Sequence, residues 1–267
     1  DLDLSSLRMI CTGGEPWTEK PWKWLFQVIG KSKVPIMNSA GGTEVSGSIL
    51  HCCLHRPFKV GSFNAPIPGM SADILNLDGK KVSTNEMGEL VMRKSSIGLT
   101  KSLWNDDKRY IDNYWSVIKD YWVHGDLASR DADGHWYLHG RSDDTIKVSG
   151  KRIGPSELES VIVKSGKAKE VAAVGIPDAN KGSKIILSIV PAENNDQKES
   201  FFEDLVIKDL GKSFKPDKVI FVKDLPKTRN MKIMRRVIKS CLANQDPGDL
   251  STLLNPESIE EIRSHAI

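Results

Sequence analysis

A hydroxyl and a carboxylate stand next to each other after two glycines, at the end of an apolar run. The residues are Gly41, Gly42, Thr43 and Glu44, and the run is Val34–Asn38. Glycines let a backbone approach a polyphosphate closely, and carboxylate oxygens are ligands that Mg²⁺ accepts. The same residues could instead cap the following segment, since Thr and Glu often hydrogen-bond a helix start. The pattern therefore allows either a phosphate and magnesium site or a polar cap.

A second glycine-rich loop follows the apolar run Leu7–Cys11. It contains Gly14, Glu15 and Pro16, and a helical pattern extends from Thr18 to about Val28. A strand that runs into a glycine-rich loop and then a helix is an α/β unit, and ligands bind such sheets at the carboxyl ends of the strands. Adjacent glycines alone are more typical of a plain tight turn.

Short strand-like runs alternate with charged, glycine-bearing turns between Val123 and Glu159. Asp131–Gly134 is a hairpin signal, because Gly134 can take a positive φ and Asp side chains can bond nearby backbone. The predicted elements are strands at Leu127–Arg130, His135–His139 and Thr145–Val148, then a helix that begins at Pro155. The turns between them hold Gly125 with Asp126, Gly140–Asp144, and Ser149 with Gly150. A β-meander with solvated loops would explain any one of these turns, but the ordered combination indicates a site.

The elements that would position these groups fall into two sets. The first contains the opening strand–loop–helix unit and a small β-subdomain with strands at Ala72–Leu75 and Glu89–Met92. The second, from about Thr145 to Ser240, has strands at Lys169–Ile176, Lys184–Val190 and Val219–Val222 and a helix at Phe201–Leu210. We therefore predict an α/β region followed by a complete small α+β domain. A capped helix is also expected at Asp249–Arg263.

Size, charge and cysteine content exclude several classes of protein. A chain of 267 residues is long enough for two domains, and a net charge of +3 is too small to argue for nucleic acid. No apolar run approaches ~20 residues and no signal peptide is visible, so we expect no membrane span. The cysteines are too few and irregular for a disulfide framework, which favours the cytoplasm; they are Cys11, Cys52, Cys53 and Cys241. The oligomeric state is not indicated.

The string His51-Cys52-Cys53-Leu54-His55 contains four side chains that can bind zinc. Its spacing fits no usual ligand pattern, and neighbouring residues on a strand point to opposite faces. We therefore expect a structural role for this string.

The motifs between Val123 and Glu159 resemble, in their order, those of the adenylate-forming (ANL) superfamily of acyl-CoA synthetases, adenylation domains and luciferases. The matching segments are Gly125-Asp126, Gly140–Asp144, Val148–Ile153 and Pro155–Glu159. The run from Trp104 to Trp115, which includes a predicted helix from Asp107, resembles the acetyl- and medium-chain acyl-CoA synthetase branch, as does the tail.

On this resemblance, the chain contains three regions. Residues 1–142 would be the C-terminal part of the large adenylate-forming domain, 143–240 the small mobile domain, and 241–267 a helical tail. The superfamily's Ser/Thr/Gly-rich phosphate loop ending in Lys is missing, and the chain begins in mid-pattern without Met. We therefore expect a C-terminal portion of the enzyme that does not catalyse adenylation alone.

The resemblance implies a role for each motif residue. The nucleotide would contact Gly14, Glu15, Pro16, Ala40, Gly41, Gly42, Asp126 and Arg141, and Thr43 and Glu44 would meet phosphate and Mg²⁺. Lys232 would be the catalytic lysine, although a basic loop usually means only a solvated charge run. Asp143 would be the hinge between domains. Coenzyme A would contact Ser149, Gly150, Lys151 and Arg152.

Three residues depart from the superfamily's pattern. Ala40 stands where an aromatic usually stacks on adenine, and losing a stack of this kind costs ~1–3 kcal/mol. Gly41 stands where acetate-specific members place a bulky indole, so it is expected to open the acyl pocket. Met231 replaces the glycine before the catalytic lysine, and glycine permits a tight loop that residues with a Cβ resist.

The implied activity is that of an AMP-forming acyl-CoA synthetase. It would join a small-molecule carboxylic acid to coenzyme A, with ATP and Mg²⁺. Two alternatives remain open: a carrier-protein ligase or adenylation domain of the same superfamily, and a non-catalytic nucleotide- or CoA-binding module. ATP–pyrophosphate exchange with a panel of carboxylic acids would separate them.

Overall fold

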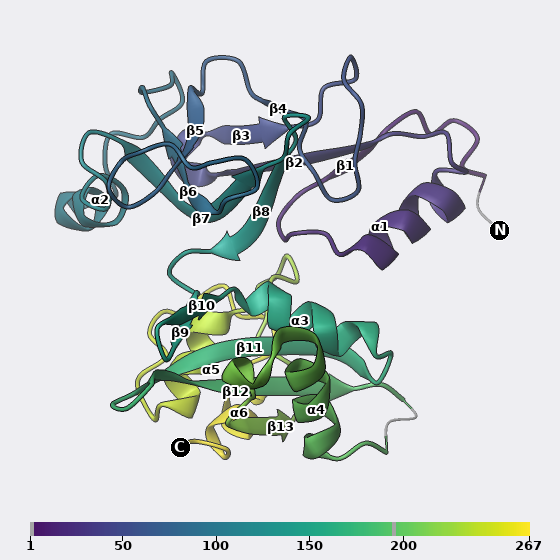
Figure 1. Ribbon diagram of the computed structural model, residues 1–267, viewed down its shortest axis with the longest axis vertical. Helices are drawn as coiled ribbons and strands as arrows, with labels where there is room; N and C mark the ends of the chain where they lie inside the picture. Colours follow the sequence, from purple (N-terminus) through teal and green to yellow (C-terminus); the bar gives the residue numbers. More distant parts are fainter. Residues whose placement is uncertain (1–2, 194–195) are drawn as a thin grey trace. The chain divides into compact units, whose positions relative to one another are not determined.

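The structure is a computed structural model that describes residues 3–193 and 196–267. The chain divides into two compact units, Asp1–Asp143 and Asp144–Ile267 (Figure 1). Each unit has its own hydrophobic core. Among the described residues, no helix has both the length and the apolar character that crossing a membrane requires.

The first unit begins with a mixed sheet in the order β1-β2-β3-β4. Its strands are β1 (Ile10–Thr12), β2 (Ile36–Gly42), β3 (Gly47–His51) and β4 (Ala65–Pro66). β1 and β2 are parallel, and the chain between them forms α1 (Glu19–Trp24), which continues as a π-helical segment, Leu25–Ile29. Parallel strands joined through a helix confirm the α/β unit predicted at the start of the chain.

An antiparallel sheet in the order β5-β6-β7-β8 completes the first unit. Its strands are β5 (Ala72–Leu75), β6 (Gly88–Met92), β7 (Trp122–Arg130) and β8 (Trp136–Arg141), and the helix before β7 is α2 (Asp107–Tyr114). Tyr114 of α2 stacks on Trp122, with ring centroids 5.2 Å apart. Ile49 and Leu50 of β3 share a core cluster with Leu90 and Trp122, so both sheets pack on one core.

Two predicted turns lie inside strands. β7 continues through Gly125 and Asp126, and β8 continues through Gly140 and Arg141, where the sequence indicated breaks. Both glycines have a positive φ, 83° for Gly125 and 102° for Gly140, and the pairing shifts register between Asp126 and Ala128. Glycine in this conformation lets a strand bulge and continue. The glycines therefore mark bulges, and the predicted strand ends were wrong.

The second unit is built on a three-stranded sheet in the order β11-β12-β13. The strands are β11 (Ala168–Asp178), β12 (Gly182–Pro191) and β13 (Lys218–Phe221). The helices are α3 (Pro155–Lys164), α4 (Glu199–Leu210), α5 (Arg235–Leu242) and α6 (Glu257–Arg263). A hairpin of β9 (Ile146–Val148) and β10 (Lys151–Ile153) precedes α3. This arrangement confirms the predicted α+β fold.

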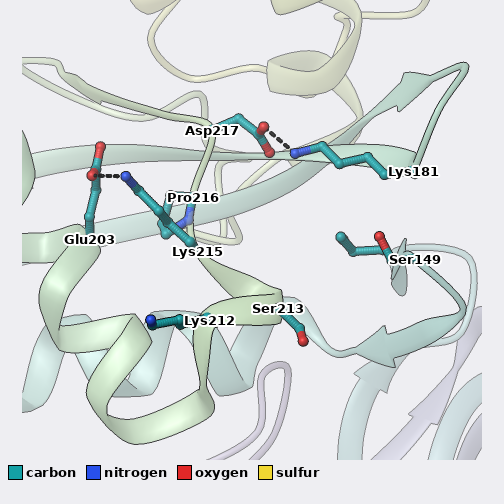
Figure 2. A pocket seen from close by; sticks show the side chains of 9 residues that line it. Ser149, Lys181, Glu203, Lys212, Ser213, Lys215, Pro216 and Asp217 are labelled. Carbon is teal, nitrogen blue, oxygen red and sulfur yellow. Dashed lines mark hydrogen bonds and ion pairs between the residues drawn. The ribbon is translucent and has the colours of Figure 1, made fainter.

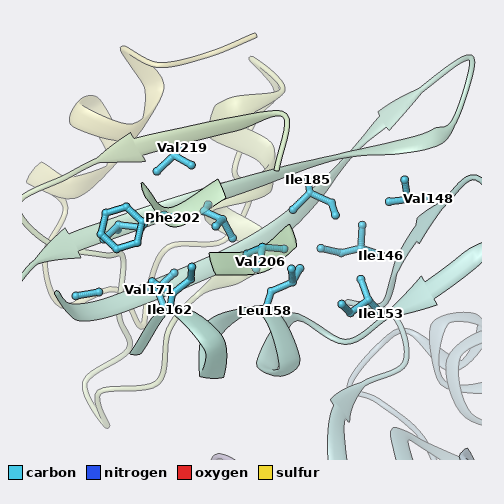
Figure 3. Packing of buried hydrophobic residues seen from close by; sticks show 14 residues of the cluster. Ile146, Val148, Ile153, Leu158, Ile162, Val171, Ile185, Phe202, Val206 and Val219 are labelled. Atoms are coloured by element: carbon cyan, nitrogen blue, oxygen red, sulfur yellow. The ribbon is translucent and has the colours of Figure 1, made fainter. Parts of the chain in front are cut away.

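Both faces of the three-stranded sheet are buried. Val171 and Ala173 of β11 belong to a core cluster with α3 and α4, which Figure 3 shows from close by. Ala172 and Val174, which point the other way, belong to a cluster with α5 and α6. Successive residues of a strand face opposite sides, so burial of both sides explains the nearly continuous apolar run in β11.

The C-terminal helix is shorter than the sequence indicated. α6 begins at Glu257, whereas a helix was predicted over Asp249–Arg263. The chain before α6 bonds another segment: the Leu254 amide donates to the carbonyl oxygen of Lys227 at 2.8 Å. The prediction was wrong over its first half, because a tertiary contact outweighs the local helical preference.

Candidate functional site

Two loops that the sequence singled out lie at the same edge of the first sheet. β1 and β2 are parallel, so the loop Gly14–Pro16 follows one strand where Ala40–Gly42 ends the other. The Thr12 hydroxyl donates to Asn38 Oδ1 at 3.1 Å, and the Ser39 hydroxyl donates to the carbonyl oxygen of Thr12 at 3.2 Å. These bonds hold the two strand ends together at the edge where such sheets bind ligands.

Gly41 lies where β3 approaches β2 very closely. A Cβ at Gly41 would stand 2.1 Å from the carbonyl oxygen of Gly47 and 2.5 Å from Cα of Ser48. Ala40 packs instead against the core of the first unit. Backbone packing therefore requires glycine at position 41. The acyl-pocket role of Gly41 and the adenine contact of Ala40 stay predictions.

Glu44 lies in a single 3₁₀ turn directly after β2. The Thr100 amide donates to the carbonyl oxygen of Glu44 at 2.7 Å and fixes its backbone. A Cβ at Gly42 would stand 3.1 Å from Glu44 Oε2 and 3.3 Å from His124 Cε1, so both side chains border this glycine. Burial, and then the charge of Glu44, raise the pKa of the Tyr114 phenol. The Glu44 carboxylate therefore lies near Tyr114 and His124, in space that a side chain at position 42 would crowd.

Asp126 and Arg141 face each other across β7 and β8. Arg141 Nη1 lies 3.5 Å from Asp126 Oδ1, and His124 Nε2 lies 3.3 Å from Asp126 Oδ2. Arg141 also donates from Nη1 to the carbonyl oxygen of His124 and from Nε to Asp143 Oδ1, both at 3.0 Å. The Asp126 side chain is 16% exposed, so its carboxylate is oriented by these partners and still reachable by a ligand.

Gly125 leaves room for the guanidinium group of Arg141. A Cβ on Gly125 would stand 2.7 Å from Arg141 Nη2 and 3.0 Å from Cζ. The φ of 83° is also one that residues with a side chain rarely adopt. Glycine is therefore needed here both for the bulge and for the close approach of Arg141.

Three polar residues at this site were not predicted from the sequence: His124, Tyr114 and Glu89. Glu89 is 7% exposed on β6, and burial raises the pKa of its carboxyl against the lowering effect of a hydrogen bond from Ser142. Two signals were available in the sequence. A lone acid precedes the apolar run Leu90–Met92, and a lone histidine follows the apolar residues Trp122 and Val123.

In the second unit, Lys232 stands near the tip of a tight hairpin. The Thr228 amide donates to the carbonyl oxygen of Lys232 at 2.9 Å, and the Lys232 amide donates to the Thr228 hydroxyl at 3.2 Å. Met231 has a φ of 64°, the left-handed conformation that glycine adopts without strain. The loop therefore keeps a tight geometry with methionine in the glycine position, and the Lys232 side chain is exposed.

The turn between β9 and β10 is a two-residue hairpin turn, as predicted. Val148 pairs with Lys151, and the residues between them have positive φ, 49° for Ser149 and 81° for Gly150. Two positive φ values are the mark of a type I′ turn, which matches the twist of the flanking strands. A Cβ on Gly150 would meet nothing within 4 Å, so this side of the turn is open.

A pocket of about 470 Å³ lies beside this turn, and Figure 2 shows it from close by. Its lining includes Ser149, Ser213 and three lysines, Lys181, Lys212 and Lys215. Lys181 pairs with Asp217 and Lys215 with Glu203, the latter pair at 2.9 Å. Three ammonium groups and two carboxylates leave this lining net positive.

The structure therefore groups the predicted residues in three places. Thr43, Glu44, Asp126 and Arg141 belong to the first unit, with the glycine loops at its sheet edge. Lys232 lies on a hairpin that precedes α5, and Ser149–Arg152 lie on the β9–β10 hairpin. Asp143 is the last residue of the first unit, and its side chain is 70% exposed. Its role as a hinge stays a prediction.

Comparison with known families identifies the class of protein. Residues 1–104 match the AMP-binding enzyme family, and residues 157–232 match the AMP-binding enzyme C-terminal domain. The chain belongs to this family of adenylate-forming enzymes, which confirms the resemblance stated from its motifs.

Individual relatives point in the same direction. The chain is 37% identical to an acetyl-coenzyme A synthetase of Methanothrix soehngenii over 97% of this chain and 40% of that protein. The fold matches an acetoacetyl-CoA synthetase from Streptomyces lividans with a TM-score of 0.84 and 23% identity, over 99% of this chain and 41% of that chain. It also matches an anthranilate CoA ligase in complex with anthranoyl-AMP, with a TM-score of 0.72 and 27% identity, over 87% of this chain and 44% of that chain. The chain spans about two fifths of the length of the curated relatives it matches.

Proposed function

We propose that the chain is a working part of an AMP-forming acyl-CoA synthetase. Such an enzyme activates a carboxylic acid with ATP, releases pyrophosphate, and transfers the acyl group from the acyl-adenylate to coenzyme A. The observation that carries this proposal is that Glu44 and His124 both border Gly42 at the end of β2, while His124 in turn contacts Asp126 and Arg141. A nucleotide needs this combination of close backbone approach, cation and carboxylate.

Asp126 would hold the ribose of the nucleotide. A carboxylate accepts hydrogen bonds from two hydroxyls, and the Asp126 carboxylate is oriented by Arg141 and His124. Arg141 would contact the ribose or phosphate, because its guanidinium is fixed by three oxygen partners and is 40% exposed. Oriented charges of this kind stabilise charge that develops on phosphate without reorganising.

Thr43 and Glu44 would meet the phosphates and a magnesium ion. Their oxygens suit Mg²⁺, which is usually bound through one or two carboxylates together with substrate phosphates and water. The bound ion would neutralise phosphate charge during transfer. The residues of the chain would orient it: the backbone of Glu44 is fixed by Thr100, and Gly42 adds no side chain beside the Glu44 carboxylate.

Lys232 would place its ammonium group between the carboxylate of the acid and the α-phosphate. A compact charge on a flexible stem can follow negative charge as it moves between these groups. The tight hairpin with Met231 in the left-handed conformation presents the lysine at an exposed tip.

The turn Ser149–Arg152 would receive coenzyme A in the second half-reaction. Its open side at Gly150 leaves room for the pantetheine arm, and the exposed side chains of Lys151 and Arg152 could meet phosphate. The net positive pocket beside the turn suits the phosphates of the same ligand. Asp143 would be the hinge about which the second unit changes its presented face, since hinges are element-terminal residues.

The acid would be a small-molecule carboxylate. The protein would work in a reducing cytoplasm, which suits its cysteines, because none of them pairs with another among the described residues. The test is ATP–pyrophosphate exchange by the whole protein with a panel of carboxylic acids, followed by transfer to coenzyme A or to a carrier protein. We expect exchange that depends on one acid and transfer to coenzyme A. Exchange without transfer to coenzyme A would favour a carrier-protein ligase, and the complete absence of exchange would favour a binding module.

A further inference from the structure

A buried lysine lies at the base of the hairpin that carries Lys232. The side chain of Lys227 is only 7% exposed, and its Nζ lies 2.7 Å from Glu170 Oε2 and 2.5 Å from Asp224 Oδ1. Burial lowers the pKa of Lys227, but the two carboxylates outweigh it and raise the pKa above its ordinary value. The ammonium group is therefore held as a cation between a residue of β11 and a residue that precedes the hairpin.

The segment before α6 completes this cluster through Asn255. Asn255 Nδ2 donates to Asp224 Oδ2 and to the carbonyl oxygen of Leu225, both at 2.8 Å, and its Oδ1 accepts from the Lys227 amide at 3.0 Å. Asn255 is 7% exposed, so these bonds are shielded from water. One asparagine therefore fixes both the backbone of Lys227 and the carboxylate that pairs with its side chain.

The same two segments continue to bond toward the hairpin tip. The Leu254 amide donates to the carbonyl oxygen of Lys227 at 2.8 Å, and the Arg229 amide donates to the carbonyl oxygen of Thr252 at 3.2 Å. Lys227 itself forms an antiparallel bridge with Ile233. The cluster around Lys227 thus fixes the backbone position of one strand of the hairpin, five residues before Lys232.

The other end of the hairpin is fixed by a second buried ion pair. Arg235 donates from Nε to Glu159 Oε1 at 2.9 Å and from Nη2 to Glu159 Oε2 at 2.8 Å. Glu159 Oε1 also accepts from the Ala173 amide of β11 at 2.9 Å. Both ends are therefore tied to β11, whereas the tip with Lys232 is exposed.

We propose that Lys227, held by Glu170, Asp224 and Asn255, is a positioning residue that aims Lys232 in the adenylate-forming step. This inference rests on the proposed function of Lys232. A buried ion pair is poor evidence for stability, because replacing both of its partners by apolar side chains is often neutral or stabilising. The ion pair instead fixes the orientation of the hairpin, since a hydrogen bond between charged groups restricts both their distance and their angle. A lysine tip displaced by ~1 Å can lose about 100-fold in rate.

The experiment uses the whole protein and measures the two half-reactions separately. Acid-dependent ATP–pyrophosphate exchange reports adenylate formation, and reaction of a supplied acyl-adenylate with coenzyme A reports thioester formation. The variants are Lys227→Met, Lys227→Arg and Asn255→Ala, with Lys184→Met as a matched control. Lys184 pairs with Asp178 at 3.6 Å and is 42% exposed. In Lys227→Met the Asp224 carboxylate, which is 44% exposed, keeps access to water, whereas the buried Glu170 Oε2 loses its cation.

We expect Lys227→Met to lower the kcat of exchange by about 10- to 100-fold with little change in KM. Thioester formation should stay within about twofold of wild type, since that step does not use Lys232. Lys227→Arg should recover part of the loss because it restores a cation, and Lys184→Met should match wild type. If Lys227→Met does not fold, as circular dichroism would show, Asn255→Ala carries the same expectation.

Three results would overturn the inference or its basis. An equal loss in both half-reactions would show a general folding role for Lys227. Unchanged exchange in Lys227→Met, with exchange lost in a parallel Lys232→Ala variant, would refute the positioning role and leave the proposed function intact. Unchanged exchange in Lys232→Ala would refute the proposed function of the hairpin itself.

Discussion

The two units hold their candidate groups in opposite ways. In the first unit, Asp126 and Arg141 lie within paired strands, and glycines make room for them where backbones or guanidinium groups come close. In the second unit, Lys232 and Gly150 lie at the exposed tips of hairpins. There the geometry is set at the base, by ion pairs such as that of the buried Lys227 with Glu170.

This difference indicates where each unit is vulnerable. A site made by close approach fails when a small volume is added, because packed backbone has nowhere to go. A tip presented on a hairpin tolerates added volume, but it loses direction when an anchor at the base is removed. Strand-held groups suit a site that stays the same throughout a reaction, and hairpin tips suit groups that act in one step only.

Gly41→Ala is expected to have the largest effect on stability. The new Cβ would stand 2.1 Å from the carbonyl oxygen of Gly47, so β2 and β3 must separate. We expect a loss of more than about 3 kcal/mol in the free energy of unfolding, measured with urea. Gly47→Ala is the control, because its Cβ would meet nothing within 4 Å. Similar losses for both variants would contradict the close-approach account.

Gly125→Ala is expected to have the next largest effect. Gly125 and Gly134 have nearly the same φ, 83° and 84°, but only at Gly125 would a Cβ crowd another group, 2.7 Å from Arg141 Nη2. Left-handed strain should cost both variants about 1 kcal/mol or more. We expect Gly125→Ala to lose about 1–2 kcal/mol beyond Gly134→Ala in urea unfolding. Equal losses would show that Arg141 moves aside freely.

The acid sensitivity of the second unit should depend on Lys227. Burial acts to raise the pKa of the Asp224 carboxyl, but hydrogen bonds from Lys227, Leu225 and Asn255 lower it overall. A carboxyl whose pKa is lower in the folded protein than in the unfolded chain stabilises the fold when the pH is above its unfolded pKa of about 3.9. This stabilisation is lost as the pH falls through the pKa of the folded state. Wild type should therefore lose up to about 1 kcal/mol more than Lys227→Met between pH 7 and pH 2.

Chemical unfolding of both proteins across this pH range measures the difference. The control is Lys184→Met, which should stay close to wild type, because Asp224 stays paired and the pKa of Asp178 is lowered chiefly by backbone hydrogen bonds from Lys181 and Asn180. Parallel curves for wild type and Lys227→Met would contradict the pairing seen in the structure.

Met231→Gly is expected to have the smallest effect, and it should stabilise. Met231 has a φ of 64°, and glycine would relieve the left-handed strain while adding some entropy to the unfolded chain. We expect a gain of about 0.5–1 kcal/mol in thermal or urea unfolding. Met231→Ala keeps a Cβ and serves as the control. A loss of stability on introducing glycine would show that the methionine side chain itself holds the loop.

Much of the fold followed from local patterns. The strands of the second unit, the start of α3 at Pro155 and the turn Ser149–Gly150 could be predicted, because apolar alternation and turn chemistry are local signals. The continuation of β7 through Gly125 could not, because a glycine in a bulge and a glycine at a strand end look alike in sequence. The shortened α6 depended on contacts between distant segments.

The candidate site shows the same limit. Motif order indicated Glu44, Asp126 and Arg141, and the structure brings these residues into the first unit. The motif order did not indicate Lys227 or Asn255. These residues are 28 positions apart in the chain and meet through a hydrogen bond from the Lys227 amide to Asn255 Oδ1. Pairing between distant polar residues leaves no periodic trace, so only the folded chain reveals such a cluster.

The most direct test of the account measures both half-reactions of the whole protein in Lys232→Ala and Gly150→Leu. Lys232→Ala should lower acid-dependent pyrophosphate exchange by at least about 100-fold and leave reaction of a supplied acyl-adenylate with coenzyme A largely intact. Gly150→Leu should do the reverse, because a branched side chain would fill the open side of the turn. Equal loss in both half-reactions from either variant would contradict the division of roles between the two hairpins.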